Sequence, residues 1–227
     1  MPSDTMLKIA AVIFDLDGVI VDTAQFHYIA WKTLAKEWDY ELGIEKNEQL
    51  KGVSRKESVA KIALWAGVRL PKAALDDVAS RKNKLYLELC AKLTPSDVLP
   101  GIANLITELK DNNIKTALGS ASKNARFVIG NLGLSNAFDV IVDGNDVLHS
   151  KPNPEVFLKA ATLMNLPYHS CVVIEDAPAG IQAAIAAQMI AVGLGDASEL
   201  HQAHFVIPNT KSLTLSKLKQ LYQQILT

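Results

Sequence analysis

Two pairs of carboxylates follow apolar runs of the kind that form buried strands. Asp15 and Asp17 come directly after the first such run of the chain, and Glu175 and Asp176 come directly after a later one. In open α/β sheets the ligand crevice lies beyond the carboxyl ends of the strands, so we expect these four side chains to converge. Carboxylates this close repel one another unless a cation lies among them or one of them is protonated. Because the set offers hard oxygen ligands without clustered His or Cys, it predicts a Mg²⁺ site.

Two further polar residues stand at other predicted strand ends. Ser120 follows a second apolar run, and Lys151 follows a third. A hydroxyl, the free amide donors at the start of the next helix and a lysine cation are the groups that a transferring phosphoryl group requires. Each residue alone is equally typical of a polar loop or a helix cap. Their joint occurrence at four strand ends favours a phosphoryl-transfer site.

The elements that position these side chains alternate between short apolar strands and helical patterns, which is typical of a parallel sheet with helices on both faces. Strands are predicted at Ala10–Phe14, Lys115–Gly119, Val140–Val142, Cys171–Ile174, Ile190–Val192 and Phe205–Ile207. Helices are predicted at Ile102–Asn112, Lys123–Asn131, Pro154–Met164 and Ala179–Ala187, with Asn112-Asn113 and Gly133 as C-terminal caps. The predicted fold class is therefore α/β, with a Rossmann-like doubly wound parallel sheet.

The stretch from Thr23 to Leu93 breaks this alternation. It contains helical patterns at Phe26–Trp38, Lys56–Ala66 and Leu75–Ala91 and no convincing strand. We therefore predict an inserted all-helical cap domain at residues 23–93 and an α/β core made of residues 1–22 and 94–227. The turn signal Leu99-Pro100-Gly101 marks the return of the chain to the core.

Composition argues against several classes of function. The chain has 227 residues, 49% of them hydrophobic, and its formal net charge of −1 gives no reason to expect nucleic acid or an anionic membrane as a partner. No apolar run is long enough to cross a bilayer, and the start of the sequence lacks the features of a signal peptide. We therefore expect a cytoplasmic protein, and as a separate expectation we take it to be a monomer. Cys90 and Cys171 are far apart and have no metal-site or redox spacing.

Taken together, the motifs resemble those of the haloacid dehalogenase superfamily. The resemblance is carried by Phe14-Asp15-Leu16-Asp17-Gly18-Val19-Ile20-Val21-Asp22-Thr23, Ser120, Lys151-Pro152 and Glu175-Asp176-Ala177-Pro178-Ala179-Gly180. It implies that Asp15 is the nucleophile that accepts a phosphoryl group and that Asp17 is the general acid and base. It also implies that Asp15, the main-chain carbonyl of Asp17 and Asp176 bind Mg²⁺, with Glu175 as a ligand or as its support. Ser120 and Lys151 would bind the transferring phosphate.

The predicted cap resembles that of the group in this superfamily that interconverts β-glucose 1-phosphate and glucose 6-phosphate through glucose 1,6-bisphosphate. The features that carry this resemblance are His27, four residues after Thr23, the loop Lys51-Gly52-Val53-Ser54-Arg55, Lys82, and the core segment Ser120-Ala121-Ser122-Lys123-Asn124. It implies that Arg55 holds the phosphate that is not transferred, and that Ser122, Lys123 and Asn124 serve the same phosphate and the sugar. Gly52 and Val53 would line the sugar pocket, while His27 and Lys51 would place Asp17. Thr23 and Lys82 complete the set expected to bind the phosphosugar, with the bisphosphate as primer and intermediate.

Other interpretations stay open. A cap-bearing sugar-phosphate phosphatase would use the same Asp15, and release of inorganic phosphate in place of isomer formation would identify it. A non-catalytic, flavodoxin-like regulatory domain would receive a phosphoryl group as a signal, but it leaves His27 and Arg55 without a role. Within the cap, Lys51 and Arg55 alone are also typical of surface charges, and Lys82 lies in a charged stretch that is typical of a solvated face.

Overall fold

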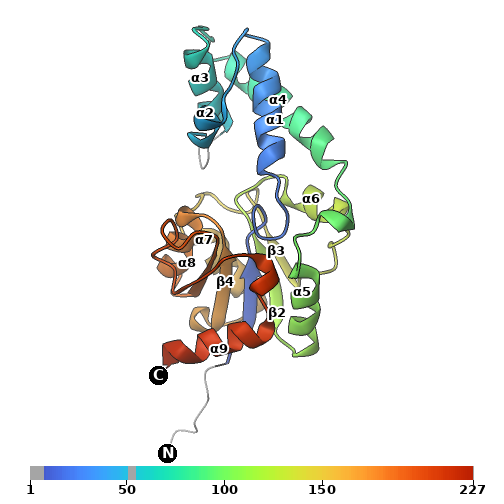
Figure 1. Ribbon diagram of the computed structural model, residues 1–227, viewed down its shortest axis with the longest axis vertical. Coiled ribbons are helices and arrows are strands. Elements are labelled where there is room, and N and C mark those ends of the chain that lie inside the picture. The colour runs from blue at the N-terminus through green and yellow to red at the C-terminus, as the bar shows by residue number, and fades with distance from the viewer. Residues whose placement is uncertain (1–7, 51–54, 227) are drawn as a thin grey trace, which may run out of the picture. The chain divides into compact units, whose positions relative to one another are not determined.

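The computed structural model describes residues 8–50 and 55–226. The chain divides into two compact units, Met1–Asp22 with Thr94–Thr227, and Thr23–Leu93, which we call the core unit and the helical unit (Figure 1). Among the helices of the described residues, none combines the length and the apolar character needed to cross a membrane. Each unit is built around its own core and is described by itself.

The core unit is built on a parallel sheet that has six strands within the described residues, in the order β3-β2-β1-β4-β5-β6. The strands are β1 (Ala11–Phe14), β2 (Lys115–Gly119), β3 (Val140–Val142), β4 (Cys171–Glu175), β5 (Ile190–Leu194) and β6 (Phe205–Ile207). All residues of β1 and β4 are buried, as expected for central strands that are covered on both faces. The chain order reverses between β1 and β4. Their carboxyl ends therefore form the switch point at which sheets of this kind bind ligands.

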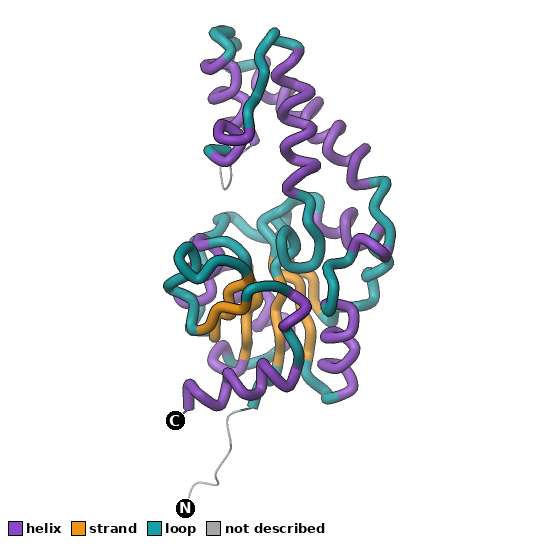
Figure 2. Tube along the Cα trace, in the orientation of Figure 1, coloured by secondary structure: helices purple, strands orange, loops and turns teal. Residues whose placement is uncertain are grey.

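Helices cover this sheet, as Figure 2 shows with the helices in purple and the strands in orange. They are α5 (Ile102–Asp111), α6 (Ala125–Asn131), α7 (Glu155–Met164), α8 (Pro178–Ala186) and α9 (Leu215–Leu226), with short 3-10 turns at Pro95–Asp97, Tyr168–Ser170 and Thr210–Ser212. Phe157 of α7 and Ile181 of α8 belong to one buried cluster with Ile13 of β1 and Val173 of β4. Burial of such side chains is the main stabilising contribution to a sheet of this kind, at about 25 cal/mol per Å² of apolar surface.

The helical unit contains α1 (Ala24–Lys36), α2 (Ile44–Glu48), α3 (Arg55–Trp65) and α4 (Ala74–Cys90). Its core is a separate buried cluster that includes Trp31 and Leu34 of α1, Ile62 of α3 and Val78 of α4. In α1, α3 and α4 the buried residues recur at helical spacing, so that one face of each of these helices is buried, whereas no residue of α2 is buried.

The α/β fold class predicted from the sequence is confirmed. The predicted bounds of β2, β3 and β6 agree with the structure, and each predicted helix begins and ends within two residues of an observed one. Asn113 and Gly133 have φ values of 57° and 70°, the left-handed conformation of a helix C-terminal cap. The sequence interpretation missed α2 and α9. It also ended β5 too early, since Gly193 and Leu194 still pair with β6.

Candidate active site

The carboxyl ends of β1 and β4 bring acidic residues side by side. Phe14 pairs with Ile174, and the N–H of Asp15 donates to the Ile174 carbonyl at 3.0 Å. One ligand oxygen from each of Asp15, Glu175 and Asp176 lies within 4.8 Å of the other two. Asp15 and Glu175 are buried, whereas Asp176 is exposed. The convergence expected from the sequence is confirmed for these three carboxylates.

A lysine from the loop after β3 lies among these carboxylates. Nζ of Lys151 donates to Oδ1 of Asp15 at 2.5 Å and to Oε1 of Glu175 at 2.6 Å. The side chains of all three residues are 10% exposed or less, so solvent and salt screen their charges weakly. One buried cation therefore compensates only part of the negative charge of the acidic group.

Burial and the surplus negative charge shift the pKa values of the site. Burial raises the pKa of Asp15 well above its ordinary value; Lys151 opposes this rise, and the neighbouring carboxylates add to it. Desolvation, with the charges of Glu175 and Asp17, raises the pKa of Asp176 to about 7. Burial by itself lowers the pKa of Lys151, but the negative charges of Asp15 and Glu175 outweigh this effect and raise the pKa above its ordinary value. A cluster of oxygen ligands with this excess of negative charge fits a divalent cation.

Asp17 lies in the tight turn that follows β1. The N–H of Gly18 donates to the Val21 carbonyl at 2.8 Å, and Gly18 has a φ of 76° that favours glycine. The charge of Asp17 contributes to the raised pKa of both Asp15 and Asp176. Its side chain thus acts on the cluster electrostatically, although it is not in the group of converging ligand atoms found in the described residues.

Two glycines, which have no side chain, provide the space that the carboxylates occupy. A Cβ atom on Gly18 would overlap the carboxylate of Asp176, and one on Gly180 would overlap the carboxylate of Glu175. In the sequence analysis Gly18 and Gly180 appear only as members of the two motifs. The signal was a glycine within the first turn of the helix that follows Glu175-Asp176.

We expect Gly18→Ala to lower Mg²⁺-dependent turnover by more than about tenfold, because the added methyl group displaces Asp176 as well as straining the turn. Gly67→Ala is the matched control, since Gly67 has a φ of 71° and nothing within 4 Å of its Cβ position. That control carries the backbone strain alone, about 1 kcal/mol. Turnover measured across a Mg²⁺ series, with thermal unfolding of each variant, checks the prediction. Equal turnover in the two variants would contradict it.

Ser120 stands at the strand end next to β1, directly after β2. Its N–H donates to the Val142 carbonyl at 3.0 Å, so the pairing of β2 with β3 continues to the edge of the site. Its Oγ accepts the N–H of Ser122 at 3.1 Å, and Oγ of Ser122 accepts the N–H of Asn124 at 3.2 Å. These turns place Ser120, Ser122, Lys123 and Asn124 on the loop that enters α6.

Lys82 is buried in the helical unit, with an exposed fraction of 1%. Its Nζ lies 2.6 Å from Nδ1 of His27, and 4.4 Å and 5.0 Å from the ring centres of Trp31 and Tyr86. Burial, with the charges of Lys82 and Arg55, lowers the pKa of His27 to about 3, so the imidazole is neutral and accepts a hydrogen bond from the ammonium. The interpretation of Lys82 as a solvated surface charge is wrong, because aromatic rings and the imidazole surround it.

The other predicted residues of this unit are placed as follows. Thr23 is buried at the start of α1, and its carbonyl accepts the N–H of His27 at 3.1 Å. Arg55 is half-buried and is the first residue of α3. Lys51, Gly52 and Val53 lie outside the described residues.

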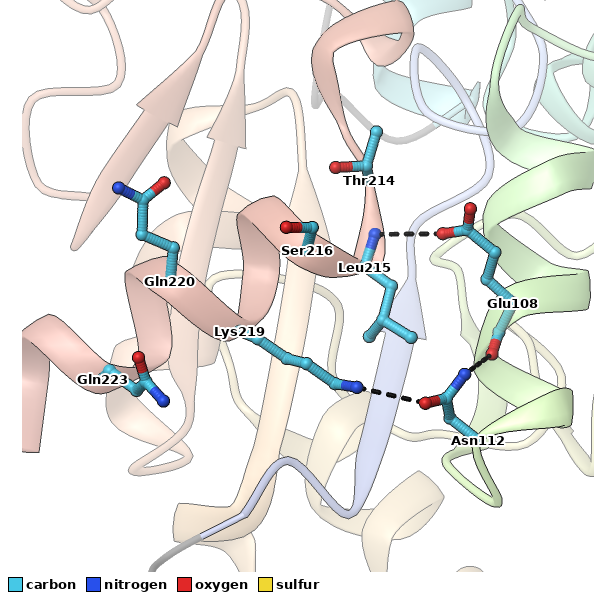
Figure 3. A pocket seen from close by; sticks show the side chains of 8 residues that line it. All are labelled: Glu108, Asn112, Thr214, Leu215, Ser216, Lys219, Gln220 and Gln223. Carbon is cyan, nitrogen blue, oxygen red and sulfur yellow. Dashed lines mark hydrogen bonds between the residues drawn. The ribbon is translucent and has the colours of Figure 1, made fainter.

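A hollow of about 640 Å³ in the core unit lies between α5 and α9 (Figure 3). Its lining consists of Glu108, Asn112, Thr214, Leu215, Ser216, Lys219, Gln220 and Gln223, and it includes none of the predicted site residues. Oε2 of Glu108 accepts the N–H of Leu215 at 3.2 Å, and Nζ of Lys219 donates to Oδ1 of Asn112 at 3.1 Å. The charged groups of this hollow are thus engaged in hydrogen bonds that join the two helices.

The doubly wound sheet and its acidic switch point place the chain among the α/β enzymes that bind their substrates beyond the carboxyl ends of the strands. The family model of the haloacid dehalogenase-like hydrolases matches residues 9–188, more than half of the sequence. The chain therefore belongs to this family.

Individual relatives span almost the whole chain. It is 42% identical over 216 residues to a β-phosphoglucomutase of Bacillus subtilis, covering 94% of this chain and 96% of that protein. It is 34% identical over 185 residues to the fructose-1-phosphate phosphatase YqaB of Escherichia coli, covering 82% of this chain and 96% of that protein. A crystal structure of β-phosphoglucomutase from Clostridium difficile is similar with a TM-score of 0.88 and 40% identity, covering 96% of this chain and 99% of that one.

Proposed function

We propose that this chain is a phosphomutase that interconverts β-glucose 1-phosphate and glucose 6-phosphate. The observation that carries the proposal is the 42% identity to the Bacillus subtilis β-phosphoglucomutase, because it extends over 96% of that protein and so includes the helical unit. The buried cluster of Asp15, Lys151 and Glu175 supplies groups suited to the chemistry. In this proposal residues 23–93 form the cap domain, and the enzyme acts as a cytoplasmic monomer on a phosphosugar.

The acidic cluster fits Mg²⁺, because its ligand oxygens converge and Lys151 leaves part of their charge uncompensated. Asp15, Asp176 and the main-chain carbonyl of Asp17 would hold the ion, with Glu175 as a ligand or as its support. When bound, the ion would reduce the repulsion between the Asp15 carboxylate and an incoming phosphate.

Asp15 is proposed to be the nucleophile. Its carboxylate oxygen attacks phosphorus, the bond from phosphorus to the donor oxygen breaks, and Asp17 gives its proton to that oxygen. In the second half, Asp17 takes the proton from a sugar hydroxyl as that oxygen attacks the aspartyl phosphate. Lys151 and Ser120 hold the transferring phosphate, with the ammonium offsetting its charge.

A mutase of this kind must bind a second phosphate, because its intermediate is glucose 1,6-bisphosphate. We assign this phosphate to Arg55, whose planar guanidinium forms paired hydrogen bonds with phosphate, together with Ser122, Lys123 and Asn124. Thr23, Gly52 and Val53 are assigned to the sugar. His27 and Lys51 are assigned to placing Asp17, and Lys82 is assigned to binding the phosphosugar.

The direct test is a coupled assay for glucose 6-phosphate formed from β-glucose 1-phosphate, with Mg²⁺ and a trace of glucose 1,6-bisphosphate as primer. We expect the β anomer to be converted and the α anomer, which is the control substrate, to be left unchanged. If the folded protein converts neither anomer, the proposal is wrong.

A sugar-phosphate phosphatase is the second candidate, and the 34% identity to the fructose-1-phosphate phosphatase of Escherichia coli favours it. Both activities would form the same aspartyl phosphate and differ in what attacks it next. Inorganic phosphate released without isomer formation would identify the phosphatase.

Arg55→Ala separates the two candidates, because it removes a ligand of the phosphate that only the mutase holds in place. We expect isomerisation efficiency to fall between about tenfold and a hundredfold, as for loss of a charged hydrogen bond of about 1.5–3 kcal/mol. Phosphorylation of Asp15 by acetyl phosphate should fall much less, since that donor has no second phosphate.

Arg69→Ala, which removes an exposed arginine from the same unit, is the control and should leave both rates unchanged. An equal fall of both rates in Arg55→Ala would mean that Arg55 acts on the fold or on the transferring phosphate. If neither rate falls, the assignment of the second phosphate is wrong.

A further inference from the structure

We propose that residues 143–146, in the loop that follows β3, form a positioning element that holds the Ser120–Asn124 segment in the conformation that binds the phosphosugar. This inference rests on the proposed function and deepens it. It gives roles to Gly144, Asn145 and Arg126, which the sequence interpretation did not single out.

The loop is tied to the segment through main-chain groups. The N–H of Gly144 donates to the Ser122 carbonyl at 3.2 Å, and Nδ2 of Asn145 donates to the Lys123 carbonyl at 2.9 Å. Asn145 is itself held, because its N–H donates to Oδ1 of Asp143 at 2.8 Å. These bonds go to carbonyls, so they set the path of the segment and are compatible with substrate binding by the side chains of Ser122 and Lys123.

The two loops approach each other closely at Gly144. A Cβ atom there would overlap the carbonyl oxygen of Ala121 and would lie 3.1 Å from Cγ of Lys123. The φ of Gly144 is not in the left-handed region, so the glycine is required by this approach and not by its own backbone conformation. Any larger residue would push the segment away from β3.

An ion-pair network fixes the same loop to the start of α6. Arg126 is the second residue of α6, and its Nε lies 3.1 Å from Oδ2 of Asp143, which is 1% exposed. Nη2 of Arg126 donates to Oδ2 of Asp146 at 2.9 Å and to the Ile141 carbonyl at 2.8 Å. The segment is therefore held from β3 on one side and at the helix that follows it on the other.

Asn145→Ala and Gly144→Ala test this role. We expect KM for β-glucose 1-phosphate to rise about threefold to tenfold in Asn145→Ala, as for loss of one hydrogen bond, and more than about tenfold in Gly144→Ala. Phosphorylation of Asp15 by acetyl phosphate should stay within about twofold of wild type in Asn145→Ala, because Ser120 is held separately by its bond to Val142.

Gly130→Ala is the control, because Gly130 lies within α6 and only Oγ of Ser135, at 3.9 Å, is near its Cβ position. It should leave both measurements unchanged. Thermal unfolding identifies variants that fail to fold, and if Gly144→Ala is one of them, Asn145→Ala decides alone. An unchanged KM in folded Asn145→Ala overturns the proposal, and so does a parallel loss of acetyl phosphate labelling. Absence of isomerisation in the wild-type protein would instead remove the proposed function.

Discussion

Asp15→Asn is expected to abolish isomerisation, lowering turnover by at least about a thousandfold. The amide has the shape of the carboxylate, but it neither attacks phosphorus nor offers a charge to a metal ion. The fold should survive, because Glu175 still accepts a hydrogen bond from Lys151 and the side-chain volume is unchanged. Turnover by the coupled assay, with circular dichroism of the same preparation, measures both expectations.

Asp111→Asn is the matched control, since Asp111 is exposed at the end of α5 in the same unit. It should retain full turnover. Activity near that of wild type in folded Asp15→Asn would show that the reaction does not pass through a phosphorylated Asp15.

Removal of divalent metal should lower turnover to below about 1%, because the repulsion between the buried carboxylates and an incoming phosphate is then uncompensated. Mg²⁺ added back after exhaustive chelation and dialysis should restore the activity. Turnover is measured as a function of free Mg²⁺ concentration.

The same titration with Asp176→Asn tests which residues bind the ion. Half-maximal activity should require a higher Mg²⁺ concentration in this variant, because it removes one of the three converging carboxylates. Undiminished turnover of the chelated wild-type protein would refute the metal assignment.

The acidic edge could be predicted because it depends on local patterns. In a parallel sheet the carboxyl ends of the strands lie at the same edge, so the residues directly after the neighbouring strands β1 and β4 meet there. That reasoning placed Asp15 beside Glu175, although the two are far apart in sequence. It also placed Lys151 correctly at the same edge, where it donates to both carboxylates.

What the sequence could not predict depends on partners that no local pattern identifies. Lys82 lies in a charged stretch of the kind that is typical of a surface, yet it is buried against His27, which is 55 residues away in the sequence. Asn145 is of a residue type common in turns, and Lys123, whose carbonyl accepts its hydrogen bond, is 22 residues away in the sequence. Helix α2 has only five residues and none of them is buried, so its sequence has no apolar periodicity that would predict a helix.

The omission of α9 has a different cause, because its pattern was present. Leu215, Leu218 and Leu221 recur every three residues and are buried, as is Tyr222. This spacing is typical of an amphipathic helix. α9 follows β6, the last strand, and so lies outside the alternation of strands and helices from which the other helices of the core unit were predicted.

In the proposed mutase the phosphoryl group on Asp15 passes to a sugar hydroxyl and not to water. The decisive experiment starts from enzyme labelled at Asp15 with radioactive acetyl phosphate and freed of the donor. β-Glucose 1-phosphate is then added, and the label is followed into sugar phosphates and into inorganic phosphate. We predict that most of the label appears in glucose 1,6-bisphosphate and glucose 6-phosphate. Label that appears only as inorganic phosphate, at a rate that the sugar does not change, would show that water and not the sugar accepts the phosphoryl group.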